Sequence, residues 1–556
     1  MATQTQTATS VFELQPTPKA TTVKPIYHPP RPSQEISNYG HRISDTESST
    51  TSSVTKPSTL RTFLTIFTPS FVGFIASFTN GIITVGLPSI ARSIALERSL
   101  YLWPSSVYGL TSGAALLIAG SVADIVGARS VELTGITFLG VFTLACGFAQ
   151  TGGQLVAFRA LQGVALALHL PASVAIITGA VPSGRARNLG FACLGFSQPL
   201  GFAVGLVLSG VMIERAGWRL GFYVTGGCTL AVAVVAVWTL PKLPSQNQDG
   251  VVALWKKVGR EIDWVGGMIS SGGLAILAYV LAIISADLKS IRSAETASLL
   301  TISIILLCAF PAWMHYRERR GKTALVPNKL WNSLPFTSTC IMVALSYGVM
   351  NSIELFSSLY FQEVQHASML ATSLYLLPNL LAGVLIQISV GLFVHCVPAR
   401  WLVAGSALIC AISPLLMAVV PPTWSYWKLA FWAQMFAPFS ADVLFTVGLI
   451  IVSDNFPEKT QALAGAVFNT VAQFGMSLGM GSCQVVALGV QVKSGSTGTG
   501  GHGDGDDGGA FEDQDDIAVL KGYRASYWLM FGYMVVCMMI AVVGLRKAGK
   551  VGLKRE

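Results

Sequence analysis

The chain has 556 residues, of which 52% are hydrophobic and only 11% are charged, and its mean hydropathy is +0.59. Soluble domains carry roughly a quarter charged residues, so this composition excludes an ordinary soluble protein and indicates that lipid surrounds most of the chain. The net charge is +9, but the basic residues stand singly or in small groups between apolar runs. That distribution is typical of a membrane protein and predicts no nucleic-acid partner.

The first 60 residues are predicted to form a disordered cytosolic tail. They are rich in Ser, Thr, Pro and Gln, and they contain no apolar run of the kind a signal peptide requires. From Leu64 onward, apolar segments of about 20 residues recur, each long enough to cross a bilayer as a helix. The predicted fold class is therefore all-α and integral to the membrane, with about fourteen spans near 62–87, 104–124, 131–150, 154–180, 188–213, 219–240, 264–286, 297–315, 336–360, 369–395, 401–420, 427–452, 461–490 and 524–545.

The distribution of Lys and Arg predicts the orientation. If the N-terminus is cytosolic, the inside loops and the C-terminal tail carry about twice as many Lys and Arg residues as the outside loops. We therefore expect both termini inside, with a basic cytosolic tail over 546–556. The acidic, Gly-rich stretch within 492–521 then becomes a flexible outer loop, and it lacks the ligand spacing of an EF-hand calcium site.

A short polar loop separates the second and third apolar runs. Its sequence is GSVADIVGARS, in which Gly120, Asp124, Gly127 and Arg129 set the frame. A carboxylate and a guanidinium at the edge of the bilayer core are unfavourable unless they find partners. We expect this loop to act as a conformational gate. The nine-residue separation of its Gly and Arg returns between Gly391 and Arg400, which indicates two related halves.

The fourth span contains a charged residue in its interior. The stretch reads FRALQG and includes Arg159, Gln162 and Gly163. An arginine within an apolar run must face a cavity or a partner rather than lipid. It either takes part in proton coupling or cargo contact, or makes a structural polar contact between helices, whereas Gly163 permits close helix packing.

Three glycines in the fifth span, Gly201, Gly205 and Gly210, form a face of small residues that predicts close helix packing.

Two acids lie well inside apolar runs and are candidate proton carriers: Glu354 in the ninth span and Asp442 in the twelfth. An ionised carboxylate is unfavourable in a dry cavity, so such a group suits reversible protonation. Each could instead be a structural, hydrogen-bonded acid. Glu354 is slightly favoured because serines surround it. His169 in the fourth span could relay protons, but a packing role is favoured.

Enzyme chemistry has little support in the sequence. The tripeptide Gly321-Lys322-Thr323 lacks the leading Gly of a phosphate-binding loop, since Tyr316 stands there. No catalytic constellation or zinc-ligand spacing can be assigned to a site. We therefore predict no enzymatic activity, no catalytic residues, no cofactor and no bound metal.

The loop from Gly120 and the Arg159 stretch together resemble two motifs of the major facilitator superfamily. Over roughly residues 60–550 the chain is similar to its fourteen-span drug:proton antiporter branch, especially the fungal multidrug and toxin exporters. The resemblance implies two six-helix bundles plus two extra helices around a cavity that opens alternately to each side. The expected divisions are an N-terminal bundle over 61–240, a linker with the extra helices over 241–330, and a C-terminal bundle over 331–545.

The chain departs from this branch in two motifs. In the fifth span, Leu206 replaces the proline of the antiporter motif and Ser209 replaces one of its glycines. At the end of the first span, Thr79 stands where drug exporters of this branch usually have an aspartate. One proton-carrying group of the branch is therefore missing, and the direction of transport suggested by the intact motif is weakened.

The resemblance implies a monomeric secondary transporter in the cell membrane that exports hydrophobic or amphipathic organic compounds in exchange for protons. One alternative is a proton-coupled uptake or vacuolar-membrane transporter for a polar solute, such as a basic amino acid or a siderophore. Another is a non-transporting membrane receptor or scaffold of the same fold.

Overall fold

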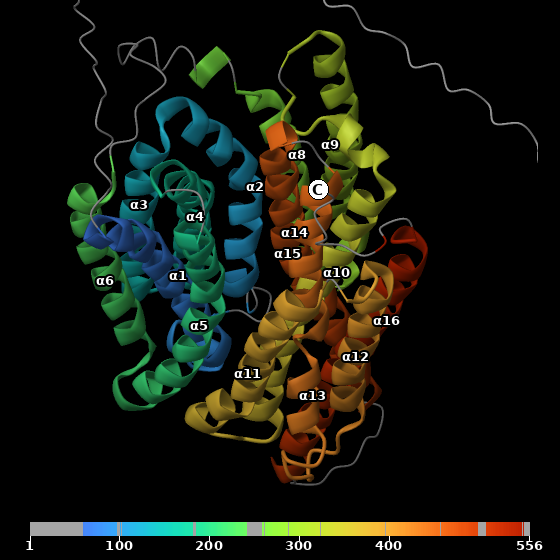
Figure 1. The fold of residues 1–556 in the computed structure, drawn as a ribbon. Helices are drawn as coiled ribbons and strands as arrows, with labels where there is room; N and C mark the ends of the chain where they lie inside the picture. Colours follow the sequence, from blue (N-terminus) through green and yellow to red (C-terminus); the bar gives the residue numbers. More distant parts are fainter. Residues whose placement is uncertain are drawn as a thin grey trace, which may run out of the picture. The chain divides into compact units, whose positions relative to one another are not determined.

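The fold is known from a computed structural model, shown in Figure 1. It describes residues 59–96, 101, 103–181, 185–241, 258–260, 262–286, 288–322, 324–394, 396–455, 458–498, 508–546 and 549. The predicted cytosolic tails, 1–60 and 546–556, lie almost entirely outside these ranges. Every regular element within them is a helix.

Fourteen helical segments in the described ranges are long and apolar enough to cross a membrane, which confirms the predicted number. The first six are α1 (Thr59–Ser93), α2 (Trp103–Val126), α3 (Ala128–Phe148), α4 (Gly152–Ala180), α5 (Arg185–Ala216) and α6 (Trp218–Thr239). The next two spans are α8 (Trp264–Ala286) and α9 (Ala294–Arg319), which are followed along the chain by α10. Two short 3-10 helices, η2 (Leu288–Arg292) and η3 (Asn328–Asn332), connect these spans. The last group is α10 (Leu334–Leu359), its π-helical extension η4 (Tyr360–Val364), α11 (Met369–Phe393), α12 (Ala399–Val419), α13 (Ala430–Phe436), α14 (Phe439–Asn455), α15 (Glu458–Gly498) and α16 (Gly508–Gly544).

Helices α1 to α6 form the N-terminal bundle, coloured blue to green in Figure 1. Glycines set the separation of α1 and α5. A β-carbon on Gly205 would lie 2.6 Å from the carbonyl oxygen of Phe78, and one on Gly201 would collide with the carbonyl of Phe74. From the α1 side, a β-carbon on Gly81 would lie 2.7 Å from the backbone nitrogen of Leu206. The two backbones therefore touch directly, as small residues in membrane helices allow.

Two arginines tie α3 and α6 together reciprocally. Arg129, in the first turn of α3, donates from Nε to the carbonyl of Leu240 (3.0 Å) just past the end of α6. Arg219, in the first turn of α6, donates to the carbonyl of Ala149 (3.0 Å) just past the end of α3. Each guanidinium thus satisfies a carbonyl that its partner helix leaves unpaired. The arrangement is that of two antiparallel copies of one helix-start motif, as an inverted repeat produces.

Both of these helices begin at a glycine that no other residue could easily replace. Gly127 precedes α3 with φ 101°, and Gly217 precedes α6 with φ 83°. Positive φ is unfavourable for residues with a β-carbon. In both places the sequence is Gly-x-Arg. The glycine turns the chain into the helix, and the arginine caps the end of the neighbouring helix.

Helices α10 to α16 form the C-terminal bundle, in which α10 packs on α15 and α12 packs on α16. The pair α8 and α9 lies outside both bundles. Helix α8 packs against α9 and also against α2 and α15, and Ser271 donates to the carbonyl of Ala114 on α2 (2.8 Å). Helix α8 therefore covers the place where α2 meets α15, and the assignment of the seventh and eighth spans as the two extra helices stays a prediction.

The twelfth span, predicted near 427–452, is confirmed at Ala430–Ile451, but a short interruption that was not predicted divides it into two helices. Helix α13 ends at Phe436 and α14 begins at Phe439. Pro438 has no N–H to donate and its ring disfavours the preceding helical turn, so the helix stops there. The thiol of Cys410 donates to the carbonyl of Ala437 (3.1 Å) at the break. A buried neighbour thereby satisfies backbone that would be unfavourable in lipid.

The helices also extend further than predicted into the range 492–521. Helix α15 continues to Gly498 and α16 begins at Gly508, so the expected flexible outer loop over this whole range is corrected to a shorter connection. Residues 499–507, which hold part of the acidic stretch, lie outside the described residues.

The close contact between α1 and α5 predicts that a glycine-to-alanine substitution lowers stability inside this contact but not outside it. We expect Gly205→Ala to lower the free energy of unfolding by about 1–3 kcal/mol, because the added methyl group has no space against Phe78. Gly227 on α6 is the matched control, since no atom lies within 4 Å of the point that a β-carbon would occupy there. Gly227→Ala should leave the melting temperature in detergent unchanged or raise it. Equal melting temperatures for both variants would contradict the assigned packing.

Candidate transport site

A buried guanidinium lies in the interior of the N-terminal bundle. Arg159 on α4 is 1% exposed. Its Nε donates to the carbonyl of Pro104 (2.8 Å), and its two terminal nitrogens donate to Gln162 Oε1 (2.7 Å) and Asn80 Oδ1 (2.7 Å). The guanidinium carbon also lies 4.3 Å from the ring centre of Tyr108. These contacts join α4 to α1 and α2.

All of these acceptors are neutral. Thr79, at the position where an acid is usual, lies 3.5 Å from Gln162 Nε2, and the same amide nitrogen donates to Thr143 Oγ1 (2.7 Å). The positive charge is therefore solvated by amide and carbonyl oxygens and an aromatic face instead of being neutralised. Such a charge can still attract an anionic or electron-rich group.

Gly163 lies directly behind this network. A β-carbon there would collide with the hydroxyl of Thr111 and the carbonyl of Tyr108 on α2. The Thr111 hydroxyl donates to the carbonyl of Ala160 (2.8 Å) across the same contact. The glycine lets α2 and α4 approach closely, and this approach brings Pro104 and Tyr108 to Arg159.

The C-terminal bundle holds two interior carboxylates, each bound by a neutral amide. Glu354 on α10 is buried and accepts a hydrogen bond from Asn379 Nδ2 (3.1 Å). Asp442, in the first turn of α14, accepts one from Gln387 Nε2 (3.1 Å). The α13–α14 break gives α14 a new N-terminus inside the bundle, and the positive end of a helix dipole favours an acid there.

A single face of α11 serves both acids. Asn379, Gly383 and Gln387 recur every four residues and therefore lie in one row along the helix. Asn379 contacts Glu354 and Gln387 contacts Asp442. A β-carbon on Gly383, between them, would lie 2.7 Å from Asp442 Oδ2. The row is thus a polar stripe in an otherwise apolar helix, and we call it the α11 stripe.

The residues of the predicted gate loop lie where α2 ends and α3 begins. Asp124 is exposed, and Arg129 bonds to carbonyls at the end of α6 as described above. Gly120 faces Pro171 on α4, with 3.8 Å from its β-carbon position to the proline Cβ. In this conformation Arg129 therefore acts within the N-terminal bundle. The role of Asp124 in gating stays a prediction.

Hydrogen bonds join the two bundles at the opposite end, where α1 and α10 finish. Ser358 Oγ donates to the carbonyl of Thr84 (2.8 Å), and Gln362 Nε2 donates to that of Val85 (3.0 Å). Tyr101, between α1 and α2, donates to Glu363 Oε1 (2.7 Å). The bundles are therefore latched at this end.

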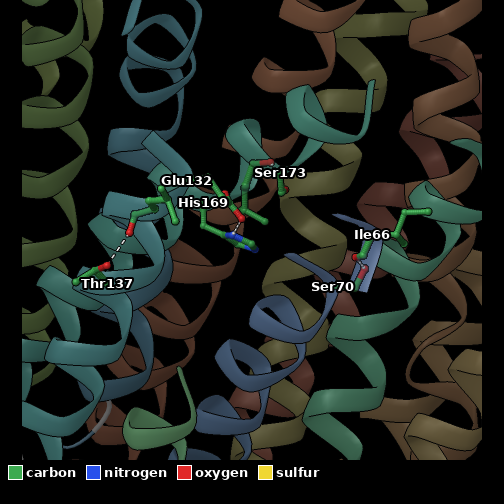
Figure 2. Close-up of polar contacts among 8 residues, drawn as sticks. Ile66, Ser70, Glu132, Thr137, His169 and Ser173 are labelled. Carbon is green, nitrogen blue, oxygen red and sulfur yellow. Dashed lines mark hydrogen bonds and ion pairs between the residues drawn. The ribbon is translucent and has the colours of Figure 1, made fainter. Parts of the chain in front are cut away.

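A fully buried acid–imidazole pair lies in the wall of the N-terminal bundle. Glu132 of α3 and His169 of α4 point toward each other (Figure 2). Glu132 Oε1 lies 2.9 Å from His169 Nδ1, and both side chains are excluded from solvent. Glu132 Oε2 and His169 Nε2 have no further hydrogen-bond partner among the described residues. Each side chain therefore has the other as its polar partner in a dry interior, where an unpartnered polar group is unfavourable. The favoured packing role of His169 thus includes an ion-pair partner.

Sequence reasoning missed Glu132 and the two amides of the α11 stripe. Glu132 is the second residue of the third predicted span, 131–150, where a polar residue is interpreted as the edge of the span. Asn379 and Gln387 are uncharged and do not interrupt their apolar run. A search for polar side chains spaced by four or eight residues within each span would have found the stripe.

The fold and these sites define an integral membrane protein with two bundles and polar groups gathered in their interiors, as secondary transporters have. The family model of the Major Facilitator Superfamily matches residues 70–480. The chain belongs to this superfamily. The prediction of a transporter rather than an enzyme is confirmed by this match and by the relatives it resembles.

Three curated relatives illustrate the range of transporters that this chain resembles. "MFS-type transporter 1" of Pyricularia oryzae is 39% identical over 531 residues, covering 89% of this chain and 85% of the relative. The "Low affinity ammonium transporter" of Saccharomyces cerevisiae is 26% identical, with 77% and 78% covered. "Efflux pump terJ" of Aspergillus terreus is 24% identical, with 83% and 84% covered.

Solved structures with low sequence identity to this chain share its fold. A bacterial homolog of the human lysosomal transporter Spinster, in an inward-facing and occupied conformation, matches with a TM-score of 0.60. The two sequences are 14% identical, and the match covers 86% of this chain and 96% of the other. This likeness confirms the fold class predicted from the sequence.

The Arg159 network predicts a graded loss of activity. Arg159→Ala leaves Gln162 and Asn80 without their buried donor, so we expect pH-driven flux in proteoliposomes to fall at least a hundredfold per folded protein. Arg159→Lys keeps the charge but loses the planar fork, so it should retain part of the flux. Arg219→Ala, which removes an arginine that caps a helix end, is the matched control and should retain flux. Native flux in Arg159→Ala would remove this residue from the mechanism.

The Glu132–His169 pair predicts a non-additive effect on stability. Glu132→Leu leaves the imidazole buried without its partner, and we expect a loss of about 3 kcal/mol in the free energy of unfolding. The double variant Glu132→Leu/His169→Leu should recover most of that loss, because no polar group is then left unpaired. Melting of the purified variants in detergent measures the cycle, and additive losses would show that the two residues do not act as a pair.

Proposed function

We propose that this protein is a monomeric, proton-coupled transporter that exports hydrophobic or amphipathic organic compounds, such as drugs or toxins, across the cell membrane. The α11 stripe carries the proposal. It holds two interior carboxylates with neutral amides, so each acid can gain or lose a proton without breaking an ion pair.

The two bundles have complementary interiors. Arg159 provides a fixed positive charge in the N-terminal bundle, and Glu354 with Asp442 provides titratable acid in the C-terminal bundle. In the proposed cycle, a proton entering from outside neutralises one of these carboxylates and a cargo molecule leaves. Neutralisation changes the attraction between the bundle interiors, and this change biases the bundles toward one opening.

Export is supported by the relative named as an efflux pump, and the small number of interior charges favours a largely apolar cargo. A second candidate is proton-coupled uptake or vacuolar transport of a polar solute. It is supported by the relative named as an ammonium transporter and by the altered fifth-span motif, with Leu206 and Ser209.

A compound panel separates these candidates. Purified protein in proteoliposomes, with a pH gradient imposed in either direction, is offered apolar, amphipathic and small polar compounds. Uphill movement of apolar compounds against the direction of proton flow supports the proposal. Movement of polar solutes in the same direction as protons supports the second candidate. Absence of any flux would contradict both and would favour a receptor.

The two carboxylates make the sharpest prediction. Glu354→Gln and Asp442→Asn each keep the shape of the side chain and an acceptor for the α11 amide, but remove the titratable group. If one acid carries the proton, its variant loses uphill, pH-driven transport by at least tenfold and retains cargo exchange at equal pH. Glu295→Gln, an exposed acid in the first turn of α9, is the control and keeps both activities. Undiminished uphill transport in both interior variants would exclude both acids as carriers.

A further inference from the structure

A cavity of about 170 Å³ opens at the latched end of the bundles, where α10 finishes and α16 begins. We call it the Glu363 cavity. Its walls include Glu363 and Tyr523, the ring of Phe356, the amides of Gln484 and Gln491 on α15, and Tyr101 from the N-terminal half. The remaining lining residues are aliphatic. The α11 stripe is built from other residues, so this is a separate site.

The chemistry of the walls favours a cation. Among the described lining residues, Glu363 is the one with a formal charge, and none is Lys, Arg or His. Aromatic side chains stand beside the carboxylate, with the rings of Phe356 and Tyr523 centred 5.7 Å apart and nearly perpendicular. A carboxylate next to aromatic faces is the arrangement that binds ammonium groups, through a charge-assisted hydrogen bond and cation–π attraction.

The carboxylate is already held by two hydroxyls. Tyr101 donates to Oε1 (2.7 Å), and Tyr523 donates to Oε2. Tyr523 belongs to α16, whereas Tyr101 belongs to the segment between α1 and α2. An ionised carboxylate only accepts hydrogen bonds, so an incoming ligand N–H needs an acceptor position on one of these two oxygens. A ligand N–H on Oε1 would compete with the Tyr101 hydroxyl and weaken one link between the bundles.

The size of the cavity limits the ligand. A protein cavity of roughly 150 Å³ accommodates benzene. A single aromatic ring with a short aminoalkyl arm therefore matches this space, whereas a large drug does not.

We propose that the Glu363 cavity is a subsite for monocationic arylalkyl amines, in which the ammonium group binds Glu363 in competition with Tyr101 and the ring lies against Phe356 and Tyr523. The proposal rests on the proposed transport function and narrows its cargo to amphipathic amines. It also implies that cargo weakens the contact between the bundles at this end, because amine binding removes the hydrogen bond from Tyr101 to Glu363.

Equilibrium binding to purified full-length protein tests the subsite with a matched pair of probes. These are 2-phenylethylamine, which is protonated at pH 7, and 2-phenylethanol, its neutral counterpart. The native protein should bind the amine at least tenfold more tightly than the alcohol, because the alcohol makes no charge-assisted contact with Glu363. Equal affinities, or no amine binding, would overturn the proposal.

Variants of Glu363 separate the effect of its charge on amine binding from the effect of the local structure. Glu363→Gln should weaken amine binding at least tenfold, and Glu363→Asp should remain within about threefold of the native affinity. Glu214→Gln is the matched control. Its carboxylate also joins the halves, accepting from the backbone of Leu370 (3.0 Å), but it lies outside the cavity, so amine affinity should not change. Native-like affinity in folded Glu363→Gln, or a comparable loss in Glu214→Gln, would overturn the assignment.

Tyr101→Phe tests the competition independently of any change in charge. Removing the hydroxyl frees an acceptor position on Glu363, so amine binding should tighten severalfold, and weaker or unchanged binding contradicts the competition. Proton-driven export of other compounds is measured on the same preparations. Export without amine binding overturns the subsite alone, and amine binding without export in any compound overturns the proposed function alone.

Discussion

Three interior ionisable groups of this protein, Arg159, Glu354 and Asp442, are held by neutral partners instead of opposite charges. Arg159 is bound by a carbonyl, two side-chain amides and an aromatic ring, and Glu354 and Asp442 are each bound by one amide. Burying a charge with its counterion gives a closed, static pair, whereas amides stabilise a charge without neutralising it. The arginine thus lies in one bundle and the two acids lie in the other. Any electrostatic force between them acts across the interface between the two bundles.

The remainder of the fold keeps each bundle stiff around these groups. In the N-terminal bundle, glycines bring α1 against α5 and α2 against α4, and reciprocal arginine caps tie α3 to α6. The Glu132–His169 pair joins α3 to α4 through a buried polar contact. Between the bundles, α2 packs on α15 and α5 packs on α11, and at the latched end Ser358 and Gln362 donate hydrogen bonds to backbone carbonyls of α1.

The architecture could be predicted from the sequence because apolar length and charge placement are local properties. The fourteen spans and the arginine inside the fourth of them follow from the pattern of hydropathy, whereas the two extra helices were expected only from the resemblance to the family. The break at Pro438 was missed because the flanking residues remain apolar on both sides. The partners of the acids were missed for a different reason: Asn379 and Gln387 carry no charge, and their importance depends on α11 packing beside α10 and α14. Pairing across helices, as between Glu132 and His169, is likewise a property of the packed structure. The domain boundaries and the orientation in the membrane stay predictions.

The central claim is that cargo moves in exchange for protons bound by Glu354 or Asp442. The most direct measurement uses proteoliposomes without an imposed pH gradient, loaded with a transported compound and a pH-sensitive dye. The account predicts that outward flow of the compound down its own gradient acidifies the lumen, and that the double variant Glu354→Gln/Asp442→Asn passes the compound with no change in luminal pH. Flow of the compound through the native protein without acidification, or equal acidification with the double variant, would contradict it.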